Sequence, residues 1–276
     1  MQIQNQPQYN KNICNPSFKS YYQPVTEVLG RPISTNNTSF FRAELEWNKF
    51  TDFLIKKYQH TDKVNIHCYA CSDGAEPFSL AILLIKKLGE GAKKFFPIIA
   101  SDIDPKILEN PKKGKVILSD CDIVNIEDEL GTDYSKFIKH NDDFKLLKEY
   151  NAHDEVCEGT VSPEVRKAVV FKSYDIMDNI TNIPAQNTVV MARNFWPYLP
   201  EEKQQSLAKK IANQLSDTST LVLGTFDKRE SSAINAITDN GFKDTSVDHC
   251  FEKPSTREKD LLINPEFLKN TFIPKK

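Results

Sequence analysis

Residues 64–85 of the chain read VNIHCYACSDGAEPFSLAILLI, and their pattern predicts a strand, a tight loop and a helix. The run of β-branched and aromatic residues breaks at 72–74, after which apolar residues recur at helical spacing from Phe78 to Ile85. Such a turn places a glycine and unpaired backbone N–H groups at the carboxyl end of a strand. Open α/β sheets bind their ligands at that end, so we expect a ligand site here.

The composition of this loop narrows the class of ligand. Gly74 alone is too little for the dinucleotide fingerprint, and no Gly-Lys-Ser/Thr sequence follows it to hold phosphates. Glu76 stands at the start of the expected helix, where it suits the helix dipole and can also face a cationic group. A nucleoside ligand that carries a positive charge therefore fits the loop better than a polyphosphate.

Strands and helices alternate along the rest of the chain. We expect further strands at 95–100, 168–171, 188–191 and 220–223, helices within 40–58, 200–215 and 230–240, and a final antiparallel strand or hairpin within 242–251. This alternation predicts an α/β fold with a doubly wound, mostly parallel sheet.

Composition argues against several classes of partner. The 36 Lys and Arg residues against 38 Asp and Glu give a net charge of -2, which offers no basic surface for nucleic acid. No apolar run approaches the roughly 20 residues of a membrane span, and the polar start lacks the features of a signal peptide. We therefore expect a cytoplasmic protein without membrane insertion.

The cysteines and histidines suggest neither a disulfide framework nor a metal site. The 6 cysteines are scattered, and we expect them to be reduced. Cys68 and Cys71 resemble a redox pair only by their spacing, so a redox or metal function is the weaker interpretation. The 5 histidines are also scattered, and we expect no bound metal.

Four blocks, in order along the chain, resemble the CheR family of chemotaxis-receptor glutamate O-methyltransferases. ACSDGAEPFSLA at 70–81 is similar to the family's S-adenosylmethionine (SAM) loop, and TNNTSFFR at 35–42 is similar to its T-N-x-T-x-F-F-R pattern. ASDID at 100–104 and RNFWPY at 193–198 resemble two further family blocks. The resemblance implies a SAM-dependent methyltransferase of Rossmann-like fold, with S-adenosylhomocysteine (SAH) as the product.

The resemblance also suggests how the chain is organised. We expect an extended or partly ordered arm at 1–33, a CheR-like domain at 34–253 and a peripheral tail at 254–276. The charged interval 107–165 carries short β-like runs; in the family it is a small antiparallel subdomain that docks on receptors, and a merely solvated insertion is the alternative. The family's N-terminal helical domain is expected to be lacking, because only the short arm stands in its place.

Matched positions imply a set of site residues. The resemblance makes Arg42 and Tyr198 catalytic residues near the transferred methyl group, with Arg42 able to hold an acceptor carboxylate. An ion pair from Arg42 to Glu44 or Glu46 at the surface is the alternative. The implied cofactor-binding residues are Asn36, Thr38, Arg42, Ala70, Glu76, Asp102, Asp175, Ile176, Arg193 and Asn194.

Some of these residues have narrower expected roles. Glu76 is expected near the ammonium group of SAM, and Asp102 on the ribose hydroxyls, with the capping of a helix at Pro105 as the alternative for Asp102. Asp175 and Ile176 are expected on the adenine side. Three residues depart from the family pattern, and these departures allow a shifted acceptor: Ala75 for Glu, Asp175 for Asn, and Pro197 for an aliphatic residue.

The chemistry of methyl transfer fits this set of residues. An ionised carboxylate needs no general base to attack a sulfonium methyl group, so alignment and exclusion of water are what the protein must supply. We therefore expect a methyltransferase that O-methylates a carboxylate, a protein glutamate or a related acid, on a protein or a small molecule. The alternative is a catalytically inactive module that binds SAM or SAH, or docks a protein.

Overall fold

The structure, a computed structural model, describes residues 26–28, 31–33, 38–141, 143–146 and 155–255 of the chain. It divides into two compact units, 1–35 and 36–276. In the first unit, strands β1 (Thr26–Val28) and β2 (Arg31–Ile33) pair antiparallel. Asn36, most of the expected arm and nearly all of the expected tail lie outside the described residues.

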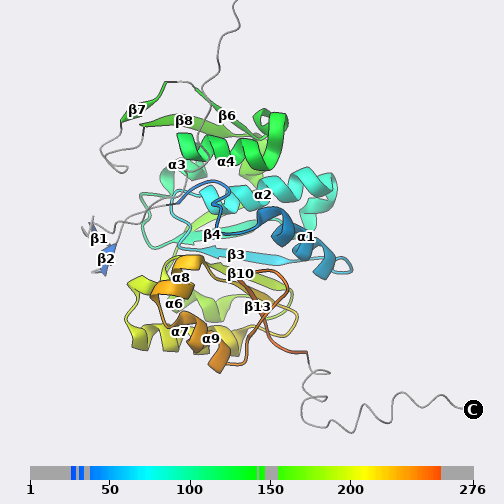
Figure 1. Cartoon of the computed structure of the whole chain (residues 1–276), viewed down its shortest axis with the longest axis vertical. Helices are drawn as coiled ribbons and strands as arrows, with labels where there is room; N and C mark the ends of the chain where they lie inside the picture. The colour runs from blue at the N-terminus through cyan, green and yellow to red at the C-terminus, as the bar shows by residue number, and fades with distance from the viewer. Residues whose placement is uncertain (1–25, 29–30, 34–37, 142, 147–154, 256–276) are drawn as a thin grey trace, which may run out of the picture. The chain divides into compact units, whose positions relative to one another are not determined.

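The second unit is built on a seven-stranded sheet with the order β12-β13-β11-β10-β3-β4-β9 (Figure 1). The parallel strands are β3 (Asn65–Tyr69), β4 (Ile98–Asp102), β9 (Val169–Ser173), β10 (Thr188–Ala192) and β11 (Thr220–Val222). β13 (Cys250–Glu252) runs antiparallel to both of its neighbours, β11 and β12 (Lys243–Asp244). The predicted doubly wound, mostly parallel sheet is confirmed.

The strand order reverses beside β3. From this central strand the chain builds the sheet outward through β4 and β9 on one side, and later through β10 and β11 on the other. The carboxyl ends of β3 and β10 therefore flank the crevice in which open α/β sheets bind ligands. The loop expected to bind the ligand, at 70–74, leaves β3 at this end.

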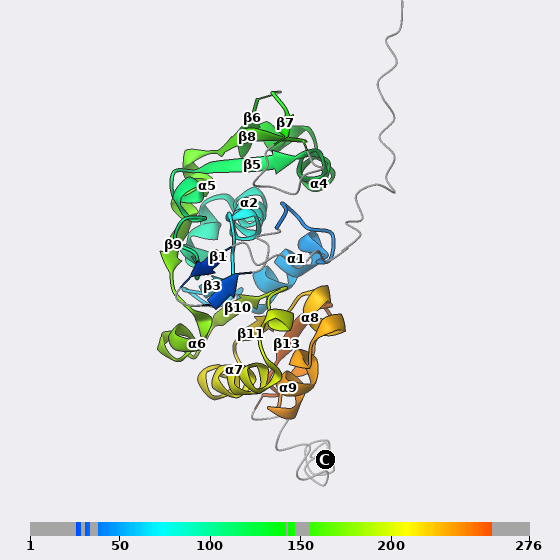
Figure 2. The ribbon, with the colours of Figure 1, turned by 90° about the vertical axis from the view of Figure 1, so that its left-hand side faces the viewer.

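Helices cover both faces of the sheet, as Figure 2 shows. On one face lie α1 (Trp47–Lys57) and α2 (Ala75–Leu88), and on the other α7 (Glu201–Gln214) and α9 (Ala233–Asp239). β10 is buried throughout, and its side chains alternate between two apolar clusters: Val189 and Met191 belong to one, Val190 and Ala192 to the other. None of the described helices is long and apolar enough to span a membrane.

The inserted subdomain at 107–165 contains a small antiparallel sheet flanked by short helices. β8 (Glu155–Val161) pairs with β5 (Lys115–Ser119), β6 (Ile138–His140) and β7 (Lys145–Leu146). Around it lie α3 (Glu109–Lys112), α4 (Asp120–Leu130), the 3₁₀ helix η2 (Gly131–Lys136) and α5 (Pro163–Ala168). The sequence analysis predicted only short β-like runs here and missed α4, because this helix is acidic and buries few residues. The local pattern that marks its start is the capping box of Ser119 and Asp122.

Several expected bounds shift. The helix expected from residue 40 begins at Trp47, and the strand expected from 95 begins at Ile98, after the 3₁₀ helix η1 (Gly89–Phe95). The helix expected at 230–240 is α9, which begins at Ala233, and a separate helix, α8 (Thr225–Glu230), precedes it and ends at an extended Ser231. Short helices that were not expected also include α6 (Ile176–Asn179), η3 (Ile180–Asn182) and η4 (Trp196–Tyr198).

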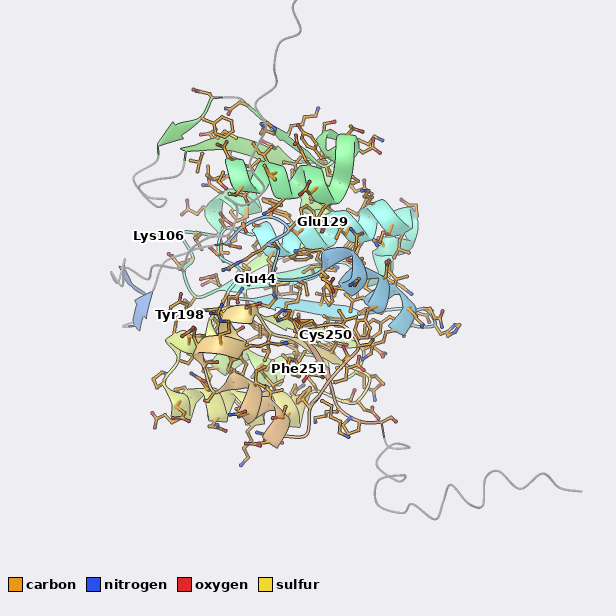
Figure 3. All side chains as sticks on the ribbon, viewed as in Figure 1. Glu44, Lys106, Glu129, Tyr198, Cys250 and Phe251 are labelled. Carbon is orange, nitrogen blue, oxygen red and sulfur yellow. The ribbon has the colours of Figure 1, made fainter. Side chains whose placement is uncertain are left out.

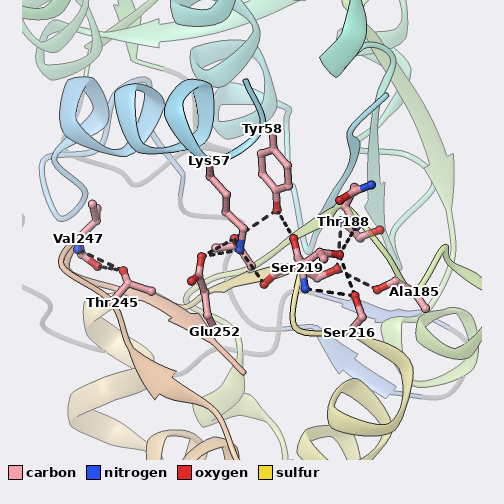
Figure 4. A network of polar contacts seen from close by, with 12 residues as sticks. Lys57, Tyr58, Ala185, Thr188, Ser216, Ser219, Thr245, Val247 and Glu252 are labelled. Atoms are coloured by element: carbon pink, nitrogen blue, oxygen red, sulfur yellow. Dashed lines mark hydrogen bonds and ion pairs between the residues drawn. The ribbon is translucent and has the colours of Figure 1, made fainter. Parts of the chain in front are cut away.

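At the amino-terminal edge of the sheet, the end of α1 is tied to the strands by polar contacts (Figure 4). Lys57 Nζ donates to Thr220 Oγ1 at 3.0 Å and forms an ion pair with Glu252 at 2.5 Å. The Tyr58 hydroxyl donates to the Thr218 carbonyl at 3.1 Å. Ser219 Oγ accepts the Thr188 N–H at 3.1 Å, which links the starts of β10 and β11.

Candidate functional site

The loop at 70–74 has an unusual backbone. Ala70, Ser72 and Gly74 have φ of 53°, 52° and 90°, in the left-handed region that costs non-glycine residues about 1 kcal/mol or more each. A Cβ at Gly74 would lie 2.9 Å from the Phe171 ring, so glycine is also required by space. Strain of this kind persists where the surroundings fix it, and it clusters at binding sites.

Asp102, at the end of β4, holds this loop in place. Its Oδ2 accepts the Ser72 N–H at 2.9 Å and its Oδ1 accepts the Asp104 N–H at 3.0 Å. Burial raises the pKa of the Asp102 carboxyl, and the backbone N–H bonds oppose that rise. Each oxygen keeps a further lone pair for a ligand hydroxyl. The alternative that Asp102 caps a helix at Pro105 is wrong, because the next helix, α3, begins at Glu109.

Two arginines and two glutamates form a charge cluster between the loop and α1. Arg193, just after β10, pairs through Nη1 with Glu76 Oε2 at 2.6 Å, and its Nη2 lies 4.0 Å from Glu44 Oε2. Arg42 Nη2 lies 3.3 Å from Glu44 Oε1. Burial lowers the pKa of Arg42 and raises that of Glu76. The cluster is thus electrically balanced and largely withdrawn from water.

The ion pair of Arg42 with Glu44 is therefore part of the site. Their side chains are only 13% and 20% exposed, whereas the surface alternative required a solvated pair. Glu46, the other proposed partner, instead pairs with Lys49 at 2.6 Å, and both side chains are exposed. The sequence suggested Glu44 only as a surface ion-pair partner of Arg42. Its contacts with Arg193 and Asn194 could not be foreseen from sequence spacing.

Arg193 carries donors that no described residue satisfies. It is 4% exposed, and among the described residues its Nε and Nη2 have no hydrogen-bond partner. The Trp47 ring lies 5.7 Å from its guanidinium carbon and offers a cation–π contact to one face. Buried guanidinium N–H groups are costly when unpaired, so these donors suit an anionic group of a ligand.

Asn194 links the charge cluster to the loop after β11. It has a φ of 61°, and its Nδ2 donates to Glu44 Oε2 at 3.0 Å while its Oδ1 accepts the Phe226 N–H at 3.2 Å. A Cβ at Gly224 would lie 1.9 Å from Asn194 Oδ1, so only glycine admits the Asn194 side chain.

Asp227 is a residue of this region that the sequence analysis missed. Fully buried, it accepts N–H bonds from Asn194 at 2.6 Å, Gly224 at 2.7 Å and Trp196 at 3.1 Å. Burial raises the pKa of Asp227 to about 7, against the effect of these bonds. The carboxylate of Asp227 thus fixes the loop that carries Arg193 and Asn194. In the sequence, the pattern Gly-x-x-Asp after a strand is the signal for such a residue.

Tyr198 lies at the exposed rim of the site. It ends η4, is 40% exposed, and its ring centroid lies 5.8 Å from that of Phe226. Figure 3 labels Tyr198 together with Glu44. Interaction with Tyr198 raises the pKa of Arg42, although burial of Arg42 has the larger, opposite effect. The preceding Trp196 is buried and donates to the Ala192 carbonyl at 2.8 Å, so it is a core residue.

Asp175 and Ile176 lie beside the same edge of the sheet. Asp175 caps α6, where its side chain accepts the Met177 N–H at 2.9 Å, and Ile176 is buried at 7% exposure. Both follow β9, the neighbour of β4. Thr38 is half-buried. Direct contacts therefore join Arg42, Arg193 and Asn194 through Glu44, and Glu76 through Arg193, while Ala70 lies in the adjoining loop that Asp102 holds.

Comparisons with known proteins identify the family of the chain. Residues 36–236 match the family "CheR methyltransferase, SAM binding domain". The chain is 25% identical to a chemotaxis protein methyltransferase of Listeria innocua, over 70% of this chain and 65% of the relative. It is 27% identical to a chemotaxis protein methyltransferase of Borreliella burgdorferi, over 70% of this chain and 64% of the relative. A probable chemotaxis protein methyltransferase of Rhizobium etli is 24% identical over 83% of this chain and 84% of the relative. The chain thus covers less than two thirds of the first two relatives.

Proposed function

Because the chain belongs to the CheR methyltransferase family, we propose that it transfers a methyl group from SAM to a carboxylate. SAM is its cofactor, as the sequence predicted. The proposed acceptor is the side chain of a protein glutamate or a related acid, and the relatives' name, chemotaxis protein methyltransferase, favours a protein. The observation that carries this proposal is the buried charge cluster of Arg42, Glu44, Glu76 and Arg193.

Charge balance favours an ionised acceptor. The cluster is neutral by itself, since two guanidinium groups face two carboxylates. SAM brings one net positive charge, which an acceptor carboxylate cancels, whereas SAH and a methyl ester are together neutral. Buried charge is costly unless it is balanced. A carboxylate acceptor therefore leaves the site neutral both before and after transfer.

The residues present have distinct roles in this proposal. Bound SAM supplies an electrophilic methyl group on a sulfonium. Arg42 orients the acceptor carboxylate, and the Asp102 oxygens accept ribose hydroxyls beside the strained loop. Glu76 faces the cofactor's ammonium group, and the free donors of Arg193 face an anionic group. An ionised carboxylate has no proton to lose, so the site needs no general base.

A methyl-transfer assay tests the proposal. The full chain is incubated with SAM labelled in its methyl group and a glutamate-containing peptide, and the same peptide with glutamine is the control. A carboxyl methyl ester hydrolyses in alkali to volatile methanol, so we expect base-labile label on the glutamate peptide alone. Base-stable label, or label on both peptides, contradicts a carboxylate acceptor. Binding of SAM without transfer to this peptide or to a cell lysate indicates the inactive binding module.

A further inference from the structure

We propose that Asp122 and Asn125, on α4 of the inserted subdomain, position Arg42 for catalysis. The inference rests on the proposed function, which gives Arg42 its role at the acceptor. Asp122 lies 80 residues after Arg42 in the chain and matches none of the four family blocks. Its importance comes from the contacts of the short segment that precedes α1.

Both backbone polar groups of Phe40 are held by side chains of α4. The Phe40 N–H donates to Asp122 Oδ1 at 2.6 Å, in a buried bond. The Phe40 carbonyl accepts from Asn125 Nδ2 at 3.1 Å. Phe40 itself is 1% exposed, so its main chain cannot exchange these partners for water.

The next two residues are fixed to other helices. The Phe41 N–H donates to Ser79 Oγ on α2 at 3.0 Å, and Phe41 has a φ of 45°, a strained value for a bulky residue. The Phe41 ring packs edge-on against Trp47 of α1, with centroids 5.9 Å apart. Trp47 Nε1 in turn donates to the Arg42 carbonyl at 3.1 Å. Three helices, α4, α2 and α1, therefore hold the backbone from which the Arg42 side chain extends.

One of these three anchors belongs to the inserted subdomain. The strained φ of Phe41 persists only while the backbone on both sides of it is held. Loss of the α4 contacts frees the main chain of Phe40, so the strained φ of Phe41 can relax. This relaxation moves the backbone of Arg42 and with it the side chain. A displacement of about 1 Å at a positioning group can cost about a hundredfold in rate. The inserted subdomain thus sets the geometry at Arg42.

Two of the contacts of Asp122 are separable, and this permits a matched control. Its Oδ1 holds Phe40, whereas its Oδ2 accepts from the Ser119 N–H at 2.9 Å and the Ser119 hydroxyl at 2.8 Å. Ser119→Ala weakens the helix cap and leaves the Phe40 anchor intact. Asp122→Ala removes both. Asp122→Asn keeps one acceptor oxygen for Phe40 and loses the second carboxylate oxygen.

The test compares single-turnover methyl transfer to the glutamate peptide at saturating SAM in these variants and in Asn125→Ala. We expect Asp122→Ala to transfer at least about tenfold more slowly, Asn125→Ala to fall between it and the wild type, and calorimetric SAM affinity to change less than about twofold. Ser119→Ala and Asp122→Asn should transfer near the wild-type rate, although the lost cap costs Ser119→Ala about 1 kcal/mol of stability. A wild-type rate in Asp122→Ala, or an equal loss in Ser119→Ala, overturns the inference.

Amide hydrogen exchange separates this inference from the proposed function. Asp122→Ala should accelerate exchange at Phe40 and Phe41 and leave the Arg193–Asn194 loop unchanged, while Ser119→Ala should affect neither. If the wild type methylates no acceptor, the proposed function fails, but the exchange rates at Phe40 and Phe41 still test whether α4 holds this backbone. Unchanged exchange at Phe40 in Asp122→Ala overturns the positioning role.

Discussion

At the amino-terminal edge of the central sheet the polar side chains that meet α1 have partners, whereas at the carboxyl-terminal edge some buried donors have none among the described residues. Lys57 donates to the Ser219 carbonyl and Thr220 and pairs with Glu252 (Figure 4). At the other edge, Arg193 Nε, Arg193 Nη2 and Ser72 Oγ have no hydrogen-bond partner in the described part of the chain.

Strained backbone occurs at both edges but gathers at the carboxyl-terminal one. Ala70, Ser72 and Asn194 have positive φ in loops that leave the carboxyl ends of β3 and β10, whereas Asn187, with a φ of 51°, lies at the start of β10. Unsatisfied donors and strained residues lower the stability of a fold, so they persist where a ligand uses them. From this difference we infer that the amino-terminal edge contributes folding stability, and we propose that the carboxyl-terminal edge carries binding and catalysis. Substitutions at the two edges should therefore have separable effects.

The largest effect is expected at Arg42. Arg42→Ala should reduce single-turnover methyl transfer by about a hundredfold, because the acceptor carboxylate loses its orienting partner. Cofactor affinity should change far less, and lysine should restore the rate only partly, since it lacks the planar fork. Arg229→Ala, at an exposed arginine of α8, is the matched control. A wild-type rate in Arg42→Ala would show that the acceptor is neutral or is bound elsewhere.

A stability effect without a binding effect is expected at Lys57. Lys57→Met should lower the free energy of unfolding by about 1–3 kcal/mol, because it leaves the partly buried Glu252 without its cationic partner. Urea denaturation measures this loss, and SAM affinity should stay unchanged. The exposed neighbour Lys56→Met should change stability by less than about 0.5 kcal/mol. A weakened SAM affinity in Lys57→Met would break the division between the two edges.

A pH effect is expected at Asp73, in the loop after β3. Burial first, and then the charge of Asp122, raise the pKa of Asp73 to about 7 from 3.8. The folded protein then holds this proton up to about pH 7, while the unfolded chain releases it near pH 4, so Asp73 removes stability as the pH rises through that window. Asp73→Asn should lack this loss.

Urea midpoints at several pH values measure the effect at Asp73. The stability of Asp73→Asn relative to the wild type should grow between about pH 4 and 7, by at most about 1.4 kcal/mol per pH unit, and then level off. A difference that is constant with pH would show that Asp73 is ionised throughout. The asparagine oxygen still accepts the Ala75 N–H, so that local contact is retained.

The smallest effect is expected at Glu44. Its carboxylate pairs with Arg42 and so competes with an anionic acceptor for the guanidinium group. Glu44→Gln should therefore lower the acceptor KM by roughly fivefold, which corresponds to about 1 kcal/mol of binding free energy. The glutamine oxygen can still accept from Asn194 Nδ2. Glu46→Gln, which affects only the exposed pair with Lys49, should change nothing. A raised KM would mean that Glu44 helps to bind the acceptor.

Local patterns predicted the part of the fold that depends on short-range signals. β3, the loop at 70–74, α2 and β10 lie within a few residues of their predicted places, since periodicity and glycine mark them directly. The start of α1 was wrong, because the segment at Phe40 and Phe41 is held by Asp122 and Ser79. Contacts over such separations leave no local pattern, and the acidic α4 was missed for want of a clear apolar stripe.

The site shows the same limit. Matched blocks pointed to Arg42, Glu76, Arg193 and Asn194, which the structure brings together. Asp227 was missed because its role depends on N–H groups of Asn194 and Trp196, about 30 residues earlier in the chain. The roles of these residues toward SAM and the acceptor stay predictions.

Calorimetric titration of the full chain with SAM and SAH tests most directly whether the carboxyl-terminal edge is the binding site. The wild type should bind both ligands, and Asp102→Ala should bind both at least about tenfold more weakly, because each lost charge-assisted bond is worth roughly 1.5–3 kcal/mol. Lys57→Met, at the opposite edge, should bind as the wild type does. Undiminished SAM affinity in Asp102→Ala, or no binding by the wild type at millimolar SAM, would contradict the account.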